Sequence, residues 1–326
     1  MRAILVVNPQ ATSTTAGGRD VLAHALASQV KLDVVETDYR GHAMAVARSA
    51  ARDGIDLVVA HGGDGTVNEV VNGLLADAVT PGAPPQAGGS AARTPGRGGP
   101  TQIGHVPALG VVPGGSANVF ARALGISADS FEATHQLLNA LENDRSRRVG
   151  LGLADGHWFT FNAGLGWDAD VVGRVAKRRG KQTTAGLYLR AAVRSYFRPP
   201  LGRPDLTIRI PGEEPAEALT AFVSNTDPWS YLGRRAVHLN PGCSFETGLG
   251  LFALNGLGLP TVFKHVRQAL VTKSNQRGRR LVRHDDLPMI RIDAAEPVNF
   301  QVDGDLVGQR TEVEFFSVPN ALTVIA

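Results

Sequence analysis

The N-terminal part of this chain alternates between short apolar runs and segments with helical periodicity. Short apolar runs predict buried strands, and the longer periodic segments predict helices. The predicted strands are Ala3–Val7, Leu32–Thr37, Leu57–His61 and Leu109–Val112, and the predicted helices are Arg19–Val30, His42–Asp53 and Val67–Leu75. This alternation is typical of a parallel α/β sheet covered on both faces, in which ligands bind at the carboxyl ends of the strands.

After a predicted helix at Phe131–Leu141, the pattern changes to short strands separated by Gly, Pro and Asp. The predicted strands here are Arg147–Ala154, Trp158–Ala163, Leu206–Ile210, Ala218–Ser224, Gly250–Asn255, Met289–Asp293, Val298–Val302 and Thr311–Ser317. Helical stretches interrupt them at Ala185–Tyr196 and Thr261–Val271. The succession of short strands favours an all-β, sandwich-like or barrel-like unit.

The length of 326 residues favours two hydrophobic cores. The change of pattern predicts an α/β domain over residues 1–146, completed by residues 319–326, and a β-rich domain over residues 147–318. Within the first domain, residues 78–106 consist mainly of Pro, Gly, Ala, Ser and Thr. Such a segment buries too little apolar surface to offset its ordering entropy, so we expect a flexible surface insertion.

Composition excludes several classes of protein. Apolar residues make up 43% and charged residues 19%, which excludes a disordered or fibrous chain. No apolar run approaches the length of a membrane helix, and the first one, Ala3–Val7, is too short for a signal peptide. The single cysteine, Cys243, permits no internal disulfide. We therefore expect a cytoplasmic protein.

The distribution of charge is more informative than its total. A net charge of +3 is too small to indicate nucleic acid as a partner. Residues 171–204 and 264–284, however, are two segments rich in Lys and Arg that contain no Asp or Glu. They are either solvated helix faces or a surface that binds an anionic membrane, where each basic side chain contributes roughly 1 kcal/mol. The second alternative predicts peripheral membrane association.

The most informative segment is Gly-Gly-Asp-Gly-Thr at residues 62–66, between a predicted strand and a predicted helix. Glycines allow the backbone to approach a phosphate, and the first N–H groups of the helix are free donors for an anion. Asp64 supplies the one carboxylate in this turn, where it could hold a metal-bound water or accept a proton. The alternative is a plain glycine turn in which Asp64 or Thr66 caps the helix.

A second glycine turn, Pro-Gly-Gly-Ser-Ala-Asn at residues 113–118, follows the next predicted strand. The two turns are expected at the same edge of the sheet, where both could contact phosphates. The chain lacks the Gly-x4-Gly-Lys-Ser/Thr pattern of P-loop proteins. It also lacks Gly-x-Gly-x-x-Gly after the first strand, which argues against a usual dinucleotide-binding fold.

Together these motifs resemble the diacylglycerol kinase catalytic family, which includes bacterial lipid kinases and the sphingosine and ceramide kinases. Further matching motifs, in the family's order, are Val-Asn-Pro at 7–9, Thr37, Gly-His-Ala at 41–43, the turn at 114–124, Phe-Asn-Ala-Gly at 161–164, Ser-Asn at 224–225 and Asp-Gly-Asp at 303–305. The resemblance implies an α/β nucleotide-binding domain like that of NAD kinases and phosphofructokinases, followed by a β-rich domain, with the active site between them.

The resemblance also implies roles for individual residues. ATP would be contacted by Asn8, Thr37, Gly62, Gly63, Gly65, Thr66, Asn68, Ser116 and Asn118. Asp64, Asp303 and Asp305 would be catalytic, and Asp64 and Asp305 would bind Mg²⁺. Taken alone, Asp303-Gly304 is also a common hairpin turn.

Three positions depart from the family's pattern. Asp305 replaces the usual Glu and is one methylene shorter, and Val119 replaces an Asp found in bacterial members. The segment 245–250 resembles an Asp-rich loop of the family but keeps only Glu246 as a carboxylate.

The sequence thus predicts an ATP- and Mg²⁺-dependent kinase that phosphorylates a lipid hydroxyl, with diacylglycerol or a sphingoid-type lipid as acceptor. The acceptor pocket is expected near the aromatic residues Phe161, Trp167, Trp229, Tyr231 and Phe252. One alternative is an NAD kinase-like or other small-molecule kinase. Another is a non-catalytic nucleotide-binding module, which the departures at Val119 and Asp305 favour. The prediction leaves a homodimer open.

Overall fold

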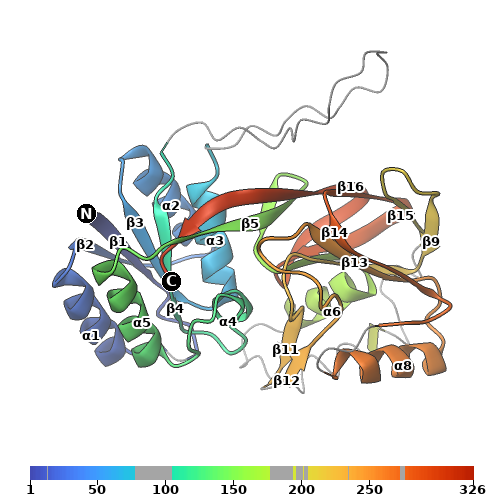
Figure 1. The fold of residues 1–326 in the computed structure, drawn as a ribbon, viewed down its shortest axis with the longest axis horizontal. Helices are drawn as coiled ribbons and strands as arrows, with labels where there is room; N and C mark the ends of the chain where they lie inside the picture. Colours follow the sequence, from blue (N-terminus) through green and yellow to red (C-terminus); the bar gives the residue numbers. More distant parts are fainter. Residues whose placement is uncertain are drawn as a thin grey trace, which may run out of the picture.

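The computed structural model describes residues 1–12, 14–77, 105–176, 194–195, 201, 205–233, 235–271 and 276–326. Most of the predicted insertion 78–106 and most of the predicted helix 185–196 lie outside these residues. Figure 1 shows a helix-flanked sheet at one end of the molecule and a strand-rich part at the other, with the long strands β5 and β16 running between them.

The N-terminal sheet is parallel, with the strand order β4-β3-β1-β2. Its strands are β1 (Arg2–Val7), β2 (Lys31–Glu36), β3 (Leu57–Gly62) and β4 (Ala108–Pro113), and its helices are α1 (Ala16–Ala27), α2 (His42–Arg52), α3 (Asp64–Leu74), α4 (Val119–Ala123) and α5 (Ser130–Glu142). Helix α2 packs against α3 and helix α1 packs against α5. Strand β3 is buried at every position, as expected for the centre of a sheet covered on both faces. The predicted α/β architecture is confirmed.

The rest of the chain is rich in antiparallel strands, which also confirms the predicted class. Its elements are β5 (Arg147–Ala154), β6 (His157–Phe159), β7 (Asn162–Gly166), α6 (Trp167–Ala176), β8 (Leu206–Arg209), β9 (Ala216–Ala218), β10 (Thr220–Ser224), β11 (Ser230–Leu232), β12 (Arg235–Val237), β13 (Leu249–Leu254), α8 (Leu259–Ala269), β14 (Leu281–Leu287), β15 (Met289–Val302) and β16 (Asp305–Val324). In the described residues, no helix is both long and apolar enough to cross a membrane.

Strand β16 belongs to both parts of the molecule. It pairs antiparallel with β15 and β5, and its end pairs parallel with β4, where Val324 lies opposite Leu109. The Ile325 N–H extends this contact by donating to the Leu109 carbonyl at 2.9 Å. One continuous sheet therefore connects the two cores. The domain boundaries at residues 146/147 and 318/319 stay predictions.

The structure differs from the sequence prediction at several elements, and two of the differences have a clear physical reason. The predicted strand Trp158–Ala163 is two strands, β6 and β7, because the backbone at residues 160–162 turns to donate hydrogen bonds to Asp303. The second is helix α6, which the sequence pattern does not predict, because Gly173 and two aspartates interrupt its apolar spacing.

The strand-rich core generates the first testable prediction. Phe315 is fully buried, and its ring meets those of Phe159 and Phe300 edge to face, with centroids 6.4 and 6.1 Å apart. We expect Phe315→Ala to lower the free energy of unfolding by about 3–5 kcal/mol, because it leaves a cavity among these rings. Urea unfolding followed by circular dichroism measures this. Phe131→Ala, at a side chain 63% exposed, is the matched control; an equal loss in both variants would contradict the prediction.

Candidate active site

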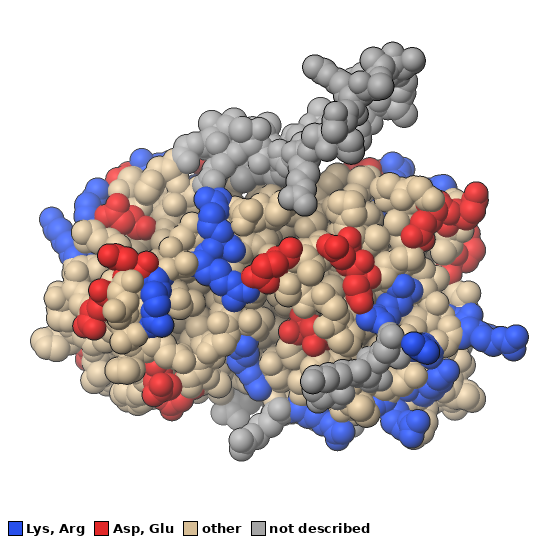
Figure 2. Space-filling model, viewed as in Figure 1, with Lys and Arg blue, Asp and Glu red and all other residues tan. Residues whose placement is uncertain are grey.

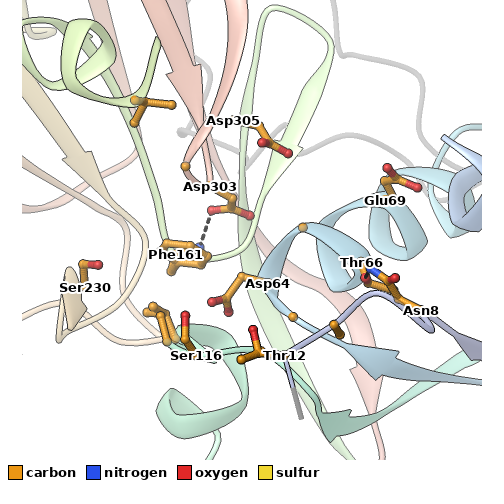
Figure 3. Close-up of a pocket in the computed structure, with 18 of the residues that line it drawn as sticks. Asn8, Thr12, Asp64, Thr66, Glu69, Ser116, Phe161, Ser230, Asp303 and Asp305 are labelled. Carbon is orange, nitrogen blue, oxygen red and sulfur yellow. Dashed lines mark hydrogen bonds between the residues drawn. The ribbon is translucent and has the colours of Figure 1, made fainter. Parts of the chain in front are cut away.

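A cavity of about 770 Å³ lies between the helix-flanked sheet and the strand-rich part and takes its lining from both. The predicted site residues that line it are Asn8, Thr37, Gly63, Asp64, Gly65, Thr66, Ser116, Asp303 and Asp305. Gly62, Asn68 and Asn118 lie behind this lining and support it, as described below. Residues far apart in the sequence therefore meet in one space, and Figure 3 shows the side chains of Asp64, Asp303 and Asp305 following one another across it.

The two glycine turns lie side by side because β3 and β4 are neighbouring parallel strands. Gly62 pairs with Pro113 at the strand ends, and the Gly114 N–H donates to the Gly62 carbonyl at 2.7 Å. A Cβ on Gly115 would lie 2.6 Å from the Gly63 Cα. Only glycine permits this approach of the two backbones, so the predicted pair of adjacent turns depends on the absence of side chains.

At the start of α3, the Thr66 and Val67 N–H groups donate to the Gly63 carbonyl at 2.9 and 3.1 Å, so the N–H groups of Asp64 and Gly65 precede the first hydrogen bond of the helix. Its N-cap, Gly63, has no side chain to accept a hydrogen bond from the first turn. The Asn8 amide donates to the Thr66 hydroxyl at 3.1 Å and so ties the end of β1 to this helix. In the second turn, the Asn118 side chain accepts from the Gly115 N–H at 3.0 Å and donates to the Gly115 carbonyl at 2.7 Å. Both turns are thus held by asparagine amides, with backbone N–H groups left for an anion.

Asp64 is the first residue of α3 and accepts a hydrogen bond from the Phe120 N–H at 3.3 Å. Burial, helped by the negative charge of Asp303, raises the pKa of Asp64 to about 7 against the opposing effect of that hydrogen bond. An aspartate with a pKa near neutrality can accept and release a proton under physiological conditions.

Asp303 lies in the two-residue turn between β15 and β16. Its φ is +46° and that of Gly304 is +77°, and Val302 pairs with Asp305 across the turn. Two positive φ angles are what a tight hairpin of this kind requires, which is why Asp-Gly is favoured there. On the sequence alone, a hairpin turn and a site residue are alternatives for Asp303. In the structure the two are compatible, because the hairpin places Asp303 at the cavity.

The Asp303 carboxylate is 6% exposed and accepts five hydrogen bonds. The donors are the Thr160 N–H and hydroxyl at 2.8 Å, the Phe161 and Asn162 N–H groups at 3.1 Å and the Asn68 amide at 2.8 Å. Burial raises the pKa of Asp303, while the hydrogen bonds from residues 160–162 oppose this shift. Because every one of these partners is a donor, the arrangement suits an ionised carboxylate that fixes the loop and α3.

Asp305 lies beside the first turn of α3. A Cβ on Gly65 would be 3.7 Å from the Asp305 Oδ2, and the same oxygen is 3.3 Å from the Arg40 guanidinium. Arg40 also lines the cavity, but the sequence analysis missed it. The signal was available, since Arg40 follows β2 and so lies at the same carboxyl edge as the glycine turns.

The other end of the cavity is apolar and aromatic. Of the predicted acceptor residues, Phe161, Trp229 and Tyr231 line it. The Arg122 guanidinium stacks 3.4 Å from the Tyr231 ring centroid. The predictions for Trp167 and Phe252 are wrong in detail, because both rings pack instead around Phe222 in a small core. The apolar lining is completed by Val171, Val172, Leu232 and Val237.

The carboxylates fit a magnesium ion that is shared with phosphates. Within the described residues, no group of three or more His, Cys, Asp or Glu could hold a metal by itself. Mg²⁺ usually takes only one or two carboxylates when phosphates and waters supply its other ligands, and Asp64 and Asp305 both reach the cavity. Glu246, in contrast, is used in an ion pair, with its Oε1 3.1 Å from the Arg147 Nε.

Comparison with known proteins gives the same relationship as the motifs. The family profile described as diacylglycerol kinase catalytic domain matches residues 2–152. Over this segment the chain is similar to the diacylglycerol kinase catalytic family. The diacylglycerol kinase of Bacillus subtilis is 34% identical over 131 residues, which are 40% of this chain and 33% of that relative. A probable YegS-like lipid kinase of Yersinia enterocolitica is 28% identical over 307 residues, which are 90% of this chain and 86% of that relative.

Solved structures share the fold over nearly the whole length. A putative diacylglycerol kinase from Bacillus anthracis superposes with a TM-score of 0.73 at 20% identity, and covers 99% of this chain and 96% of its own. An NAD kinase from Archaeoglobus fulgidus, solved in complex with ATP, gives a TM-score of 0.50 at 12% identity and covers 100% of this chain and 94% of its own. The predicted similarity of the fold to diacylglycerol kinases and to NAD kinases is confirmed.

The hydrogen bonds of Asp303 generate a prediction about stability. In Asp303→Asn, the new amide would place N–H groups against backbone N–H groups, and each buried donor left unpaired costs about 1–3 kcal/mol. We therefore expect a clear fall in the urea midpoint. Asp305→Asn in the same turn is the control and should change stability by less than about 1 kcal/mol, because its partner Arg40 is exposed. Unchanged stability of Asp303→Asn would show that this carboxylate does not hold the loop.

Proposed function

We propose that this chain is an ATP-dependent lipid kinase that transfers the γ-phosphoryl group of ATP to a lipid hydroxyl. The observation that carries the proposal is the composition of the cavity, which has phosphate-sized glycine turns at one end, an aromatic wall at the other and Asp64 between them. The match of residues 2–152 to the diacylglycerol kinase catalytic domain supports it. The proposed acceptor is diacylglycerol or a related sphingoid-type lipid.

At the polar end, backbone N–H groups of the two turns would bind the ATP phosphates. Gly63, Gly65 and Thr66 line this end directly, and Gly62 allows the Thr66 side chain to pack against β3, since a Cβ there would be 2.5 Å from the Thr66 hydroxyl. Ser116 and Thr37 would add hydroxyl contacts from neighbouring loops. Asn8, Asn68 and Asn118 would act mainly by holding the turns in place.

Phosphoryl transfer needs positioned groups and stabilisation of negative charge more than covalent help from the protein. We assign Asp64 as the group that accepts the proton of the attacking hydroxyl, because its pKa of about 7 suits a general base near neutral pH. Asp305, with Asp64, would hold Mg²⁺, which neutralises charge on the phosphates when bound. Asp303 is assigned as a positioning residue, since its carboxylate is already occupied by five donors.

At the apolar end, Phe161, Trp229 and Tyr231 would contact the lipid next to its hydroxyl. The proposed location is cytoplasmic with peripheral membrane association, because the lipid resides in a bilayer. The basic segments 171–204 and 264–284 would then contact an anionic membrane surface. Residues 177–193, 196–200 and 202–204 of the first segment and 272–275 of the second lie outside the described part of the chain.

An acceptor screen tests the proposal. The protein would be incubated with ATP and Mg²⁺ and, in parallel, with diacylglycerol, sphingosine and NAD, and products would be identified by mass. We expect a mass gain of one phosphoryl group on a lipid. Transfer to NAD alone would favour the small-molecule kinase alternative, and ATP binding without transfer would favour a non-catalytic module.

The assignment of Asp64 predicts a specific kinetic change. Asp64→Asn should lower kcat by about a hundredfold or more and leave ATP affinity measured without Mg²⁺ nearly unchanged, because it removes the base and a Mg²⁺ ligand but not the backbone phosphate contacts. Steady-state kinetics and ATP titration by calorimetry measure the two quantities. Asp33→Asn, at an exposed position of β2, is the control. An Asp64→Asn variant with wild-type kcat would remove Asp64 from the mechanism.

The same residue predicts the pH dependence. The base must be ionised, so kcat/KM for ATP should rise as pH increases through about 7, the pKa of Asp64, and level off above it. A pH–rate profile between pH 5 and 9 measures this, because it extends about two units on either side of the pKa of Asp64. A profile that is flat through neutrality would contradict the assignment.

A further inference from the structure

Helix α8 exposes a stripe of apolar side chains that the fold does not use. Leu259, Phe263 and Val266 are 61%, 73% and 48% exposed. Their spacing of i, i+4 and i+7 places them on one face of the helix. The helix is held by another face, on which His265 and Ala269 are buried, with the His265 ring 5.6 Å from that of Phe252. The exposed stripe therefore lies away from the face by which the helix contacts the rest of the molecule.

Basic residues surround this stripe. Lys264 and Arg267 are exposed on α8 itself, and the segment that follows adds exposed arginines at 277, 279 and 280. The sequence holds no Asp or Glu from Asn255 to His284. Figure 2 shows Lys and Arg gathered along the lower right edge of the molecule, where Figure 1 places α8. The apolar stripe is suited to the acyl-chain region of an anionic bilayer, and the positive charge beside it is suited to the lipid phosphates.

The helix that carries the stripe is connected to the lining of the cavity. At the end of α8, the Ala269 carbonyl accepts from the His238 N–H at 2.7 Å, and the Leu270 carbonyl accepts from the Arg235 guanidinium at 3.2 Å. These bonds join α8 to the β11–β12 hairpin, whose tip contributes exposed Leu232 and Gly233 to the cavity lining. Figure 1 shows the hairpin and α8 at the same lower edge of the molecule.

We propose that α8 and the tip of the β11–β12 hairpin form one docking face for an anionic lipid bilayer. Phe263, Leu259 and Val266 enter the acyl region, while Lys264 and Arg267 contact lipid phosphates. The proposal rests on the proposed function in that the bilayer supplies the acceptor, and docking on this face brings the cavity mouth to the membrane surface. A second copy of the chain fits this face less well, because two-fold pairing would bring the same basic residues together.

Vesicle co-sedimentation tests the docking face without ATP or acceptor. Vesicles would contain phosphatidylcholine with phosphatidylglycerol, or phosphatidylcholine alone. We expect Phe263→Ala to lower the partition coefficient about tenfold or more, because burial of a phenylalanine side chain is lost. Lys264→Gln and Arg267→Gln should each lower it about fivefold on the anionic vesicles only. Phe131→Ala, at an equally prominent phenylalanine on α5, is the matched control and should bind like the wild type.

Wild-type binding by Phe263→Ala, or equal losses in Phe263→Ala and Phe131→Ala, would overturn the docking face. Light scattering of the same proteins tests whether this face instead binds a second copy of the chain. A dimer that Phe263→Ala dissociates, with unchanged vesicle binding, would also overturn the docking face. Kinase activity is measured separately on short-chain diacylglycerol in detergent micelles. Vesicle binding that depends on Phe263, with no transfer to any lipid, would support the docking face and reject the proposed function.

Discussion

The buried carboxylate of Asp303 is the interaction on which the site depends. It accepts hydrogen bonds from the loop between β6 and β7 and from Asn68 on α3, and it is itself carried by the β15–β16 turn. These three elements come from both parts of the molecule. A single charged group, satisfied by five donors, thus ties the helix that follows the first glycine turn to the strand-rich wall of the cavity.

The negative charge of Asp303 also affects the neighbouring Asp64. Asp303 helps to raise the pKa of Asp64, whose main cause is burial, while Asp305 lies against the positive charge of Arg40. Three aspartates in one cavity therefore have three different environments. Such divergence is how similar side chains come to have separate roles in one site. In our proposal Asp64 is the base and shares the metal with Asp305, and Asp303 is a positioning group.

The sequence predicts the local features of this molecule well, because they depend on local chemistry. The glycine turns at 62–66 and 113–118, the strands that precede them and the Asp-Gly hairpin all follow from backbone preferences and apolar spacing. The roles of the three aspartates do not follow in this way, since Asp303 is distinguished only by donors that lie far from it in the sequence. Arg40 was missed although its position after β2 was visible in the sequence; its contact with Asp305 on β16 was not visible there. Trp167 and Phe252 show a different limit of the sequence. The residue type alone does not show whether an aromatic side chain lines a cavity or packs in a core.

The pairing of β16 with β4 has a consequence for how the protein is made. The edge of β4 that β16 covers stays open until the whole strand-rich part has been synthesised, because Val324 follows that part in the chain. Many proteins fold domain by domain as they leave the ribosome, with the N-terminal unit first. Here the N-terminal sheet would complete last, after waiting with an unprotected strand edge that invites pairing with other chains. Correct folding then depends on preventing the open edge of β4 from pairing with other chains during translation.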